Sequence, residues 1–117
     1  MLARTYRFHG YGSLRHVYKH GQTVRSSLLS VRYHENQRRS AYRAAIVISK
    51  KTEKSAVKRN RIRRRIYRIL RLNDTKINKP YDIVITVFNA NAAKIPTQEL
   101  NKSITDLLNQ AGITSKT

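Results

Sequence analysis

A run of cations between Ala56 and Arg71 is the part of this sequence best suited to binding chemistry. Its letters are AVKRNRIRRRIYRILR, with eight Lys or Arg among sixteen residues. No acid lies between Lys54 and Asn73, whereas a solvated helical face usually mixes Glu with Lys for pairing four residues apart. Arginine is also suited to bidentate phosphate contacts. The run therefore predicts a helix that binds nucleic acid rather than an ordinary solvated face.

The charges in the first turn of this predicted helix support the same interpretation. Lys58 and Arg59 stand where the helix dipole disfavours cations. Helix N-termini with unpaired N–H groups bind phosphates, so cations at this end indicate a phosphate ligand.

Other chemistries have less support. His16 and His20 share one helical face and form a possible metal pair, but no Cys or carboxylate precedes Glu35 to complete a site. We expect these histidines to contact RNA or solvent, and we predict neither a metal site nor a catalytic residue. The six acids are scattered, which leaves little basis for acid–base or two-metal catalysis, and no Gly-rich phosphate loop is present.

The distribution of charge along the chain supports a binding role for the basic run. The 117 residues include 25 Lys or Arg and 6 acids, a net charge of +19. Residues 1–72 account for +18 of this charge and the remaining residues for +1. This asymmetry indicates a polyanionic partner for one region, and we expect self-repulsion to ease when anions or salt are added.

The same composition favours a cytoplasmic nucleic-acid-binding protein. The chain has no cysteine, and its N-terminus lacks the apolar run of roughly 7 to 15 residues typical of a signal peptide. Its longest apolar stretch, Ala44 to Ile48, is far shorter than the ~20 residues of a membrane span, so we expect no membrane partner.

The elements that position the basic run are predicted from hydrophobic spacing and turn residues. Together they indicate one RNA-binding domain over residues 1–117, with a flexible basic arm at 1–11 and a tail at 113–117. The order is α-β-β-α-β-α, and the fold is a two-layer α/β sandwich with a small mixed sheet whose strands beside the basic helix are parallel. The predicted helices are 13–20 (N-cap Ser13), the basic run (N-cap Ser55) and 97–111 (N-cap Thr97, stop Gly112), and the predicted strands are 23–34, 42–49 and 81–89.

Helical spacing divides the basic run into two faces. An apolar stripe, predicted to face the sheet, consists of Ile62, Ile66, Ile69 and Leu70. The opposite face consists of Asn60, Arg61, Arg64, Tyr67, Arg68 and Arg71. Arg63 and Arg65 flank the stripe, where their long stems can cover apolar surface while the charge stays in water.

At these residues the sequence resembles the protein component of bacterial ribonuclease P. The resemblance rests on ISKKTEKSAVKRNRIRRRIYR, Ile48 to Arg68, a Ser-Lys-Lys strand end followed by an Arg-Asn-Arg helix. LRHVYKHG (Leu14 to Gly21) is similar to the family's first helix, and YDIVITVF to its late strand. The resemblance covers roughly residues 4 to 111, and it favours this family over the alternative of a ribosomal protein or other purely structural RNA binder.

The resemblance implies a function and a fold. The protein would pair with a catalytic RNA that holds the active site. It would assist Mg²⁺-dependent endonucleolytic removal of the 5′ leader from precursor tRNA, one protein per RNA, with Mg²⁺ bound mainly by RNA and substrate. The fold would be like the second domain of ribosomal protein S5, with a left-handed β-α-β crossover.

The resemblance also implies roles for individual residues. Tyr18 would stack on leader bases in a cleft between the first helix and the sheet, where Leu14 and Arg32 stand in place of family aromatics. The matching RNA-binding positions are Lys50, Lys51, Lys58, Arg59, Asn60, Arg61, Arg63, Arg64, Arg65 and Arg68.

Overall fold

The computed structural model describes residues 11–38, 41–77 and 79–114, and of residues 11–14 it describes the backbone alone. The predicted basic arm therefore lies outside the described residues, except for Tyr11, which begins the first helix. The elements in chain order are α1 (Tyr11–His20), β1 (Gln22–Arg25), β2 (Leu29–Glu35), β3 (Arg43–Val47), α2 (Ala56–Leu72), η2 (Asp74–Lys76), β4 (Tyr81–Val87), η3 (Ala90–Ala93) and α3 (Thr97–Ala111).

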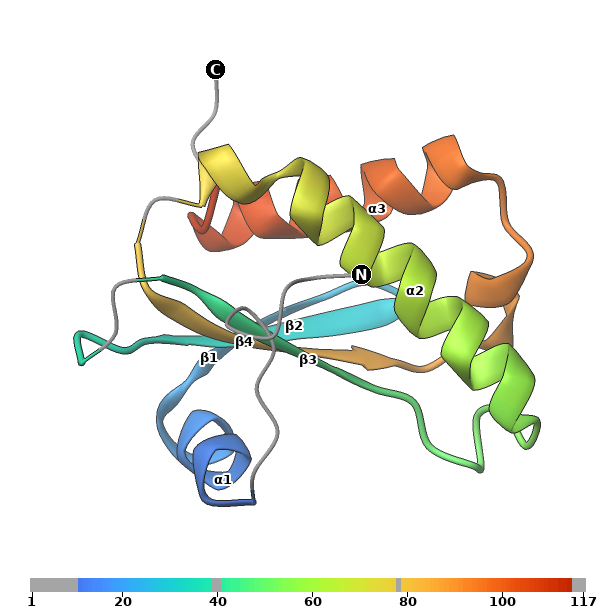
Figure 1. Ribbon diagram of the computed structural model, residues 1–117, viewed down its shortest axis with the longest axis horizontal. Helices are drawn as coiled ribbons and strands as arrows, with labels where there is room; N and C mark the ends of the chain where they lie inside the picture. The colour runs from blue at the N-terminus through green and yellow to red at the C-terminus, as the bar shows by residue number, and fades with distance from the viewer. Residues whose placement is uncertain (1–10, 39–40, 78, 115–117) are drawn as a thin grey trace.

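The four strands form one mixed sheet in the order β1-β2-β4-β3. β1 and β4 pair antiparallel with β2, whereas β3 and β4 are parallel, as predicted for the strands that flank the basic helix. Helices α2 and α3 cover one face of the sheet, and α1 crosses the other face (Figure 1). The predicted mixed α/β fold is confirmed, and α1 is the element that provides a second, separate surface.

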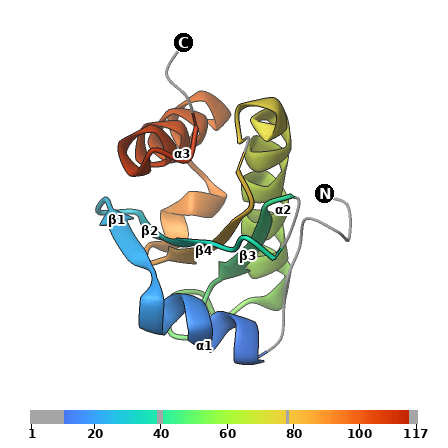
Figure 2. The same ribbon diagram turned by 90° about the vertical axis from the view of Figure 1, so that its left-hand side faces the viewer.

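The crossover from β3 through α2 to β4 is left-handed. β3 and β4 run from left to right in Figure 1, and Figure 2 looks along them from the left. In that view β4 lies to the left of β3 and α2 lies above the sheet, so the chain turns anticlockwise as the strands recede. About 98% of such crossovers are right-handed, and this exception is the one that the family resemblance implies.

The strand predicted at 23–34 is wrong, because it is a hairpin of two strands. The backbone N–H of Ser26 donates to the carbonyl oxygen of Leu29 at 2.9 Å. The Ser26 hydroxyl also accepts hydrogen bonds from the N–H groups of Leu28 and Leu29, at 3.3 and 3.4 Å. A serine side chain that satisfies nearby backbone groups in this way favours a turn over a continuous strand. The order of the long elements is therefore α-β-β-β-α-β-α.

Helix α2 begins as predicted, but it buries a wider arc than predicted. The Ser55 hydroxyl accepts a hydrogen bond from the N–H of Lys58 at 3.3 Å, which confirms the N-cap. The predicted apolar stripe is buried, and so is Tyr67, only 8% exposed, although helical spacing assigns it to the opposite face. α2 contacts η3, α3 and η2, and its buried side chains belong to the core cluster that it shares with the sheet.

The ends of the two other helices also differ from prediction. α1 starts at Tyr11, so Ser13 lies inside the helix and is not its N-cap. The N-cap of α3 is Pro96 and not Thr97, which is the first helical residue. Gly112 ends α3 as predicted, and its φ of 76° is in the left-handed region that favours glycine.

The core has two parts. The larger lies between the sheet and the α2–α3 layer, and a smaller cluster of Val17, Ala45 and Val84 lies beneath α1. Ile113 and Thr114 are buried at 1% and 3% exposure, so these two residues of the predicted tail belong to the fold. Among the described helices, none is long and apolar enough to cross a membrane.

Candidate nucleic-acid interface

The outward face of α2 carries four exposed arginines, Arg61, Arg64, Arg68 and Arg71. In the part of the chain that the structure describes, the ion pairs are Arg43–Asp82 and Lys79–Glu35, so no carboxylate neutralises these four guanidinium groups. The isoleucines on the opposite side fix the orientation of this face by docking the helix on the sheet. The result is a rigid row of charges that are available to an external polyanion.

The residues around the start of α2 divide into exposed cations and tethered ones. Lys50, Lys51 and Lys58 are exposed to solvent. Arg59 folds back instead, and its Nη1 donates to the carbonyl oxygens of Glu53 and Lys54 at 2.8 and 2.9 Å. These two bonds hold the loop that presents the lysines against the first turn of α2.

Asn60 and Arg63 are joined to each other on the surface of α2. Arg63 Nη1 donates to Asn60 Oδ1 at 3.1 Å, and Asn60 is exposed. This bond orients the amide and leaves the other guanidinium donors of Arg63 for further contacts.

Arg65 has a different environment from the other predicted RNA-binding arginines. Its Nη1 donates to the carbonyl oxygen of Ala92 at 2.7 Å, and its Nη2 donates to that of Ile95. Burial, and secondarily the charge of Arg61, lowers the pKa of Arg65. Arg65 therefore ties α2 to the segment around η3, and its place beside the apolar stripe agrees with the helical spacing, although the spacing does not identify these acceptors.

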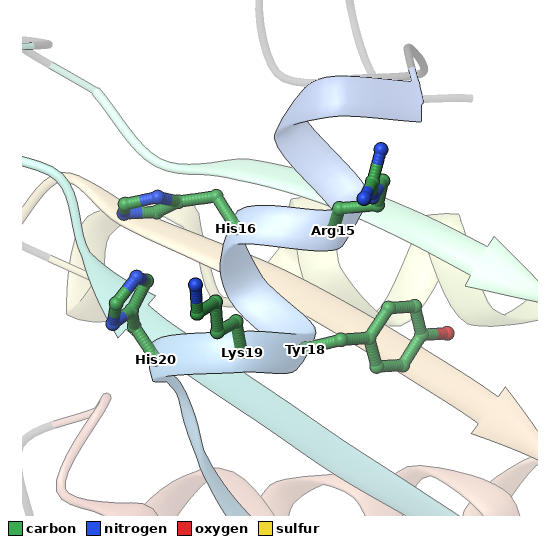
Figure 3. A pocket seen from close by; sticks show the side chains of 5 residues that line it. All are labelled: Arg15, His16, Tyr18, Lys19 and His20. Atoms are coloured by element: carbon green, nitrogen blue, oxygen red, sulfur yellow. The ribbon is translucent and has the colours of Figure 1, made fainter.

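On the other face of the sheet, α1 presents the predicted leader-cleft residues. Tyr18 is 45% exposed, and Figure 3 shows its ring pointing away from the helix on the side opposite His16 and His20. The side chain of Leu14 lies outside the described residues. A pocket of about 610 Å³ on the surface of α1 is lined by Arg15, His16, Tyr18, Lys19 and His20.

Arg32, the third residue predicted to line the cleft, is engaged within the fold. Its Nε donates to the carbonyl oxygen of Val17 at 3.1 Å, its Nη2 donates to that of Tyr18, and its Nη1 donates to Thr23 Oγ1 at 2.6 Å. Helix C-terminal carbonyls lack partners within their own helix, so Arg32 supplies donors to the end of α1 from a neighbouring strand.

The α1 connection to β1 depends on a glycine. A Cβ atom on Gly21 would lie 2.5 Å from the carbonyl oxygen of Val17 and 2.8 Å from that of Tyr33. Only a residue without a side chain permits this close approach of the helix end to β2.

Phe88 is an exposed aromatic that sequence reasoning missed as a candidate. It is 43% exposed, and the Cζ atom of Arg25 lies 5.1 Å from its ring centroid. Alternation along β4 assigns Phe88 to the same face as Val84, which packs beneath α1. That alternation is visible in the sequence, but only the sheet topology shows that this face is the one that carries α1.

Asp82 and the histidines complete the polar groups near α1. Asp82 is 2% exposed and accepts hydrogen bonds from Arg43 Nε, Arg43 Nη2 and Asn36 Nδ2 at 2.8, 2.9 and 3.0 Å. His16 and His20 lie beside His34. Within the described residues, no group of three or more His, Cys, Asp or Glu side chains could hold a metal ion.

The chain is similar to known proteins over most of its length. A family model described as Ribonuclease P matches residues 2–112. The ribonuclease P protein component of Clostridium kluyveri is 36% identical over 110 residues, 92% of this chain and 96% of that protein. That of Clostridioides difficile is 38% identical over 101 residues, 85% of each chain. The solved structure of the Staphylococcus aureus RNase P protein superposes with a TM-score of 0.84 at 25% identity, covering 94% of this chain and 98% of that one.

Proposed function

This chain belongs to the ribonuclease P protein family, and on that premise we propose that it binds the catalytic RNA subunit and assists removal of the 5′ leader from precursor tRNA. Membership in the family implies a part in tRNA 5′ processing together with an RNA subunit, as one component of an endoribonuclease. We propose one protein per RNA.

The observation that carries the proposal is the uncompensated arginine face of α2. Arg61, Arg64 and Arg68 are exposed on one rigid helix, without carboxylate partners among the described residues. A row of guanidinium groups suits the repeated phosphates of an RNA backbone, and its affinity for RNA comes largely from release of counterions. Lys50, Lys51 and Lys58 extend the same positive surface toward the start of the helix.

A second surface, on the opposite face of the sheet, suits the single-stranded leader. Tyr18 and Phe88 are exposed aromatics, and Arg25 adds a cation beside the Phe88 ring. Exposed aromatic rings stack on unpaired bases without strong sequence preference, while nearby cations attract the backbone. The catalytic RNA and the leader would thus contact opposite sides of one small protein.

We assign the Mg²⁺ requirement mainly to the RNA subunit and the substrate. The carboxylate of Asp82 is occupied by Arg43 and Asn36, and no cluster that could hold a metal is found among the described residues. The described donor groups therefore do not fit a resident Mg²⁺. In this proposal the protein contributes positive charge and RNA positioning, and the catalytic centre is on the RNA.

The test is cleavage of precursor tRNA by the protein and the RNA subunit, separately and together, over a Mg²⁺ titration. We expect no cleavage by the protein alone, and we expect the protein to lower the Mg²⁺ concentration that the RNA subunit needs. Cleavage by the protein alone, or an unchanged Mg²⁺ requirement, would contradict the proposal. A protein that binds the RNA without changing cleavage would instead be a structural RNA binder.

A further inference from the structure

Three imidazole rings gather where α1 meets β2. The ring centroid of His16 lies 4.6 Å from that of His20 and 5.0 Å from that of His34, and the His20 and His34 centroids are 6.2 Å apart. His16 and His20 come from one helical face, and β2 brings His34 to them from the sheet. Figure 3 shows His16 and His20 on the side of α1 opposite Tyr18, although all three side chains line the same surface pocket.

The charged groups around the cluster are mostly positive. Arg15 and Lys19 belong to α1 itself. A hollow of about 660 Å³ beside the cluster is lined by His16 and His34 together with Arg38 and Arg43, and by the acids Glu35 and Asp82.

Both acids that line the hollow have a cationic neighbour. Asp82 is buried and accepts three hydrogen bonds from Arg43 and Asn36. Glu35 lies 3.9 Å from Lys79. A proton added to the cluster would therefore enter surroundings in which the described cations outnumber the acids.

The surroundings in the free protein favour the neutral form of His20. Desolvation, followed by the charges of His16, Lys19 and His34, lowers the pKa of His20. His34 Nδ1 is buried without a hydrogen-bond partner among the described residues. The described part of the fold thus leaves one hydrogen-bonding group of the cluster without a partner.

We propose that His16, His20 and His34 form a proton-linked binding site for a backbone phosphate of RNA. This inference rests on the proposed function and extends it to a site separate from the arginine face of α2. A phosphodiester would supply the missing negative charge, accept hydrogen bonds from protonated imidazoles and be attracted by Lys19. Binding would take up a proton, because the phosphate stabilises the charged form that the free cluster disfavours.

The signature of the site is a pH dependence of RNA affinity that other contacts lack. Arginine and lysine stay charged near neutral pH, so their phosphate contacts change little between about pH 8 and pH 6. Uptake of one proton strengthens binding by up to about tenfold per pH unit. The affinity of the wild-type protein for RNA should therefore rise as the pH falls through this range.

The experiment measures affinity against pH for the wild type, His16→Gln/His20→Gln and the control His9→Gln, which alters the remaining histidine of the chain. Glutamine is compatible with a helix, and thermal melting of each variant verifies that it is folded. One arm uses the RNA subunit alone. The other compares precursor tRNA with mature tRNA on the assembled holoenzyme.

We expect the wild type and His9→Gln to share a pH dependence that the double variant loses. If the double variant loses the pH dependence of binding to the RNA subunit alone, the ligand is a phosphate of that RNA. If it loses only the pH dependence of precursor-tRNA binding to the holoenzyme, the ligand is a phosphate of the leader. RNA binding with the same slope in all three proteins would overturn this site and leave the proposed function intact. Failure of the wild type to bind the RNA subunit at any pH would overturn both.

Discussion

The guanidinium group of Arg32 donates from Nε to the carbonyl oxygen of Val17, 3.1 Å away, and so joins the middle of β2 to the end of α1. α1 has ten residues, too few for a stable helix without tertiary contacts. Its described apolar anchor is the small cluster of Val17, Ala45 and Val84. The position of Tyr18 and of the histidines therefore depends on this one arginine as well as on Val17.

Replacing Arg32 with Ala should loosen α1. The variant loses bonds to the carbonyls of Val17 and Tyr18 and to Thr23, and we expect the free energy of unfolding to fall by about 1 to 3 kcal/mol. Denaturant titration measures the loss, and amide hydrogen exchange should be faster in α1. Arg25→Ala is the matched control from the same sheet face. Equal effects of the two substitutions on α1 exchange would contradict the role given to Arg32.

The double substitution Arg61→Ala/Arg64→Ala should weaken binding to the RNA subunit. Two exposed phosphate contacts would be lost, so the slope of log affinity against log salt should flatten by up to about 2. Filter binding or fluorescence anisotropy over a salt series gives the slope. Lys102→Ala, an exposed cation on α3, is the control and should leave it unchanged. An unaltered slope in the double variant would argue against α2 as the contact.

Arg65→Met should lower the stability of the protein more than its affinity for RNA. Methionine keeps much of the apolar stem but loses the hydrogen bonds to Ala92 and Ile95, and we expect about 1 to 3 kcal/mol of destabilisation. The salt slope of RNA binding, measured at a temperature where the variant is folded, should match the wild type. A flatter slope of log affinity against log salt, as expected for the Arg61→Ala/Arg64→Ala variant, would instead show that Arg65 contacts phosphate directly.

Tyr18→Ala and Phe88→Ala should each weaken the binding of precursor tRNA and leave the binding of mature tRNA unchanged. Loss of one stacked base costs about 1 to 3 kcal/mol, which is roughly 5- to 150-fold in affinity. Dissociation constants of the two RNAs on the assembled holoenzyme provide the comparison. If both RNAs lose affinity equally, these aromatics do not line a leader cleft.

Acid should destabilise the free protein through the histidine cluster. The pKa of His20 lies below its ordinary value of 6.5 in the folded state, so the unfolded chain binds more protons as the pH falls through 6.5. The contribution of neutral His20 to the free energy of unfolding is therefore fully present above pH 6.5 and is lost progressively as the pH falls below it. Thermal melting between about pH 8 and pH 5.5 should show a smaller decline for His20→Gln than for the wild type. Identical declines would exclude a contribution from His20.

Local spacing determined the main elements and most of the two faces of α2. Ile62, Ile66 and Ile69 recur with the helical period and are buried, and Ser55 caps the helix because its hydroxyl needs only the N–H three residues on. Strand composition and the absence of acids near the arginines are likewise properties of neighbouring residues. The mixed α/β fold could therefore be inferred from local patterns in the sequence, whereas the family was inferred from the resemblance of the Ser-Lys-Lys and Arg-Asn-Arg motif to known members.

Tertiary structure alone decided which long side chains face outward. Arg65 meets acceptors 27 and 30 residues away, and Arg32 meets one 15 residues away, so no local pattern identifies their partners. Tyr67 is buried although helical spacing assigns it to the outward face, and His34 reaches His16 only because β2 lies beneath α1. A flexible polar side chain takes its direction from partners that folding brings near, and those partners are remote in the sequence.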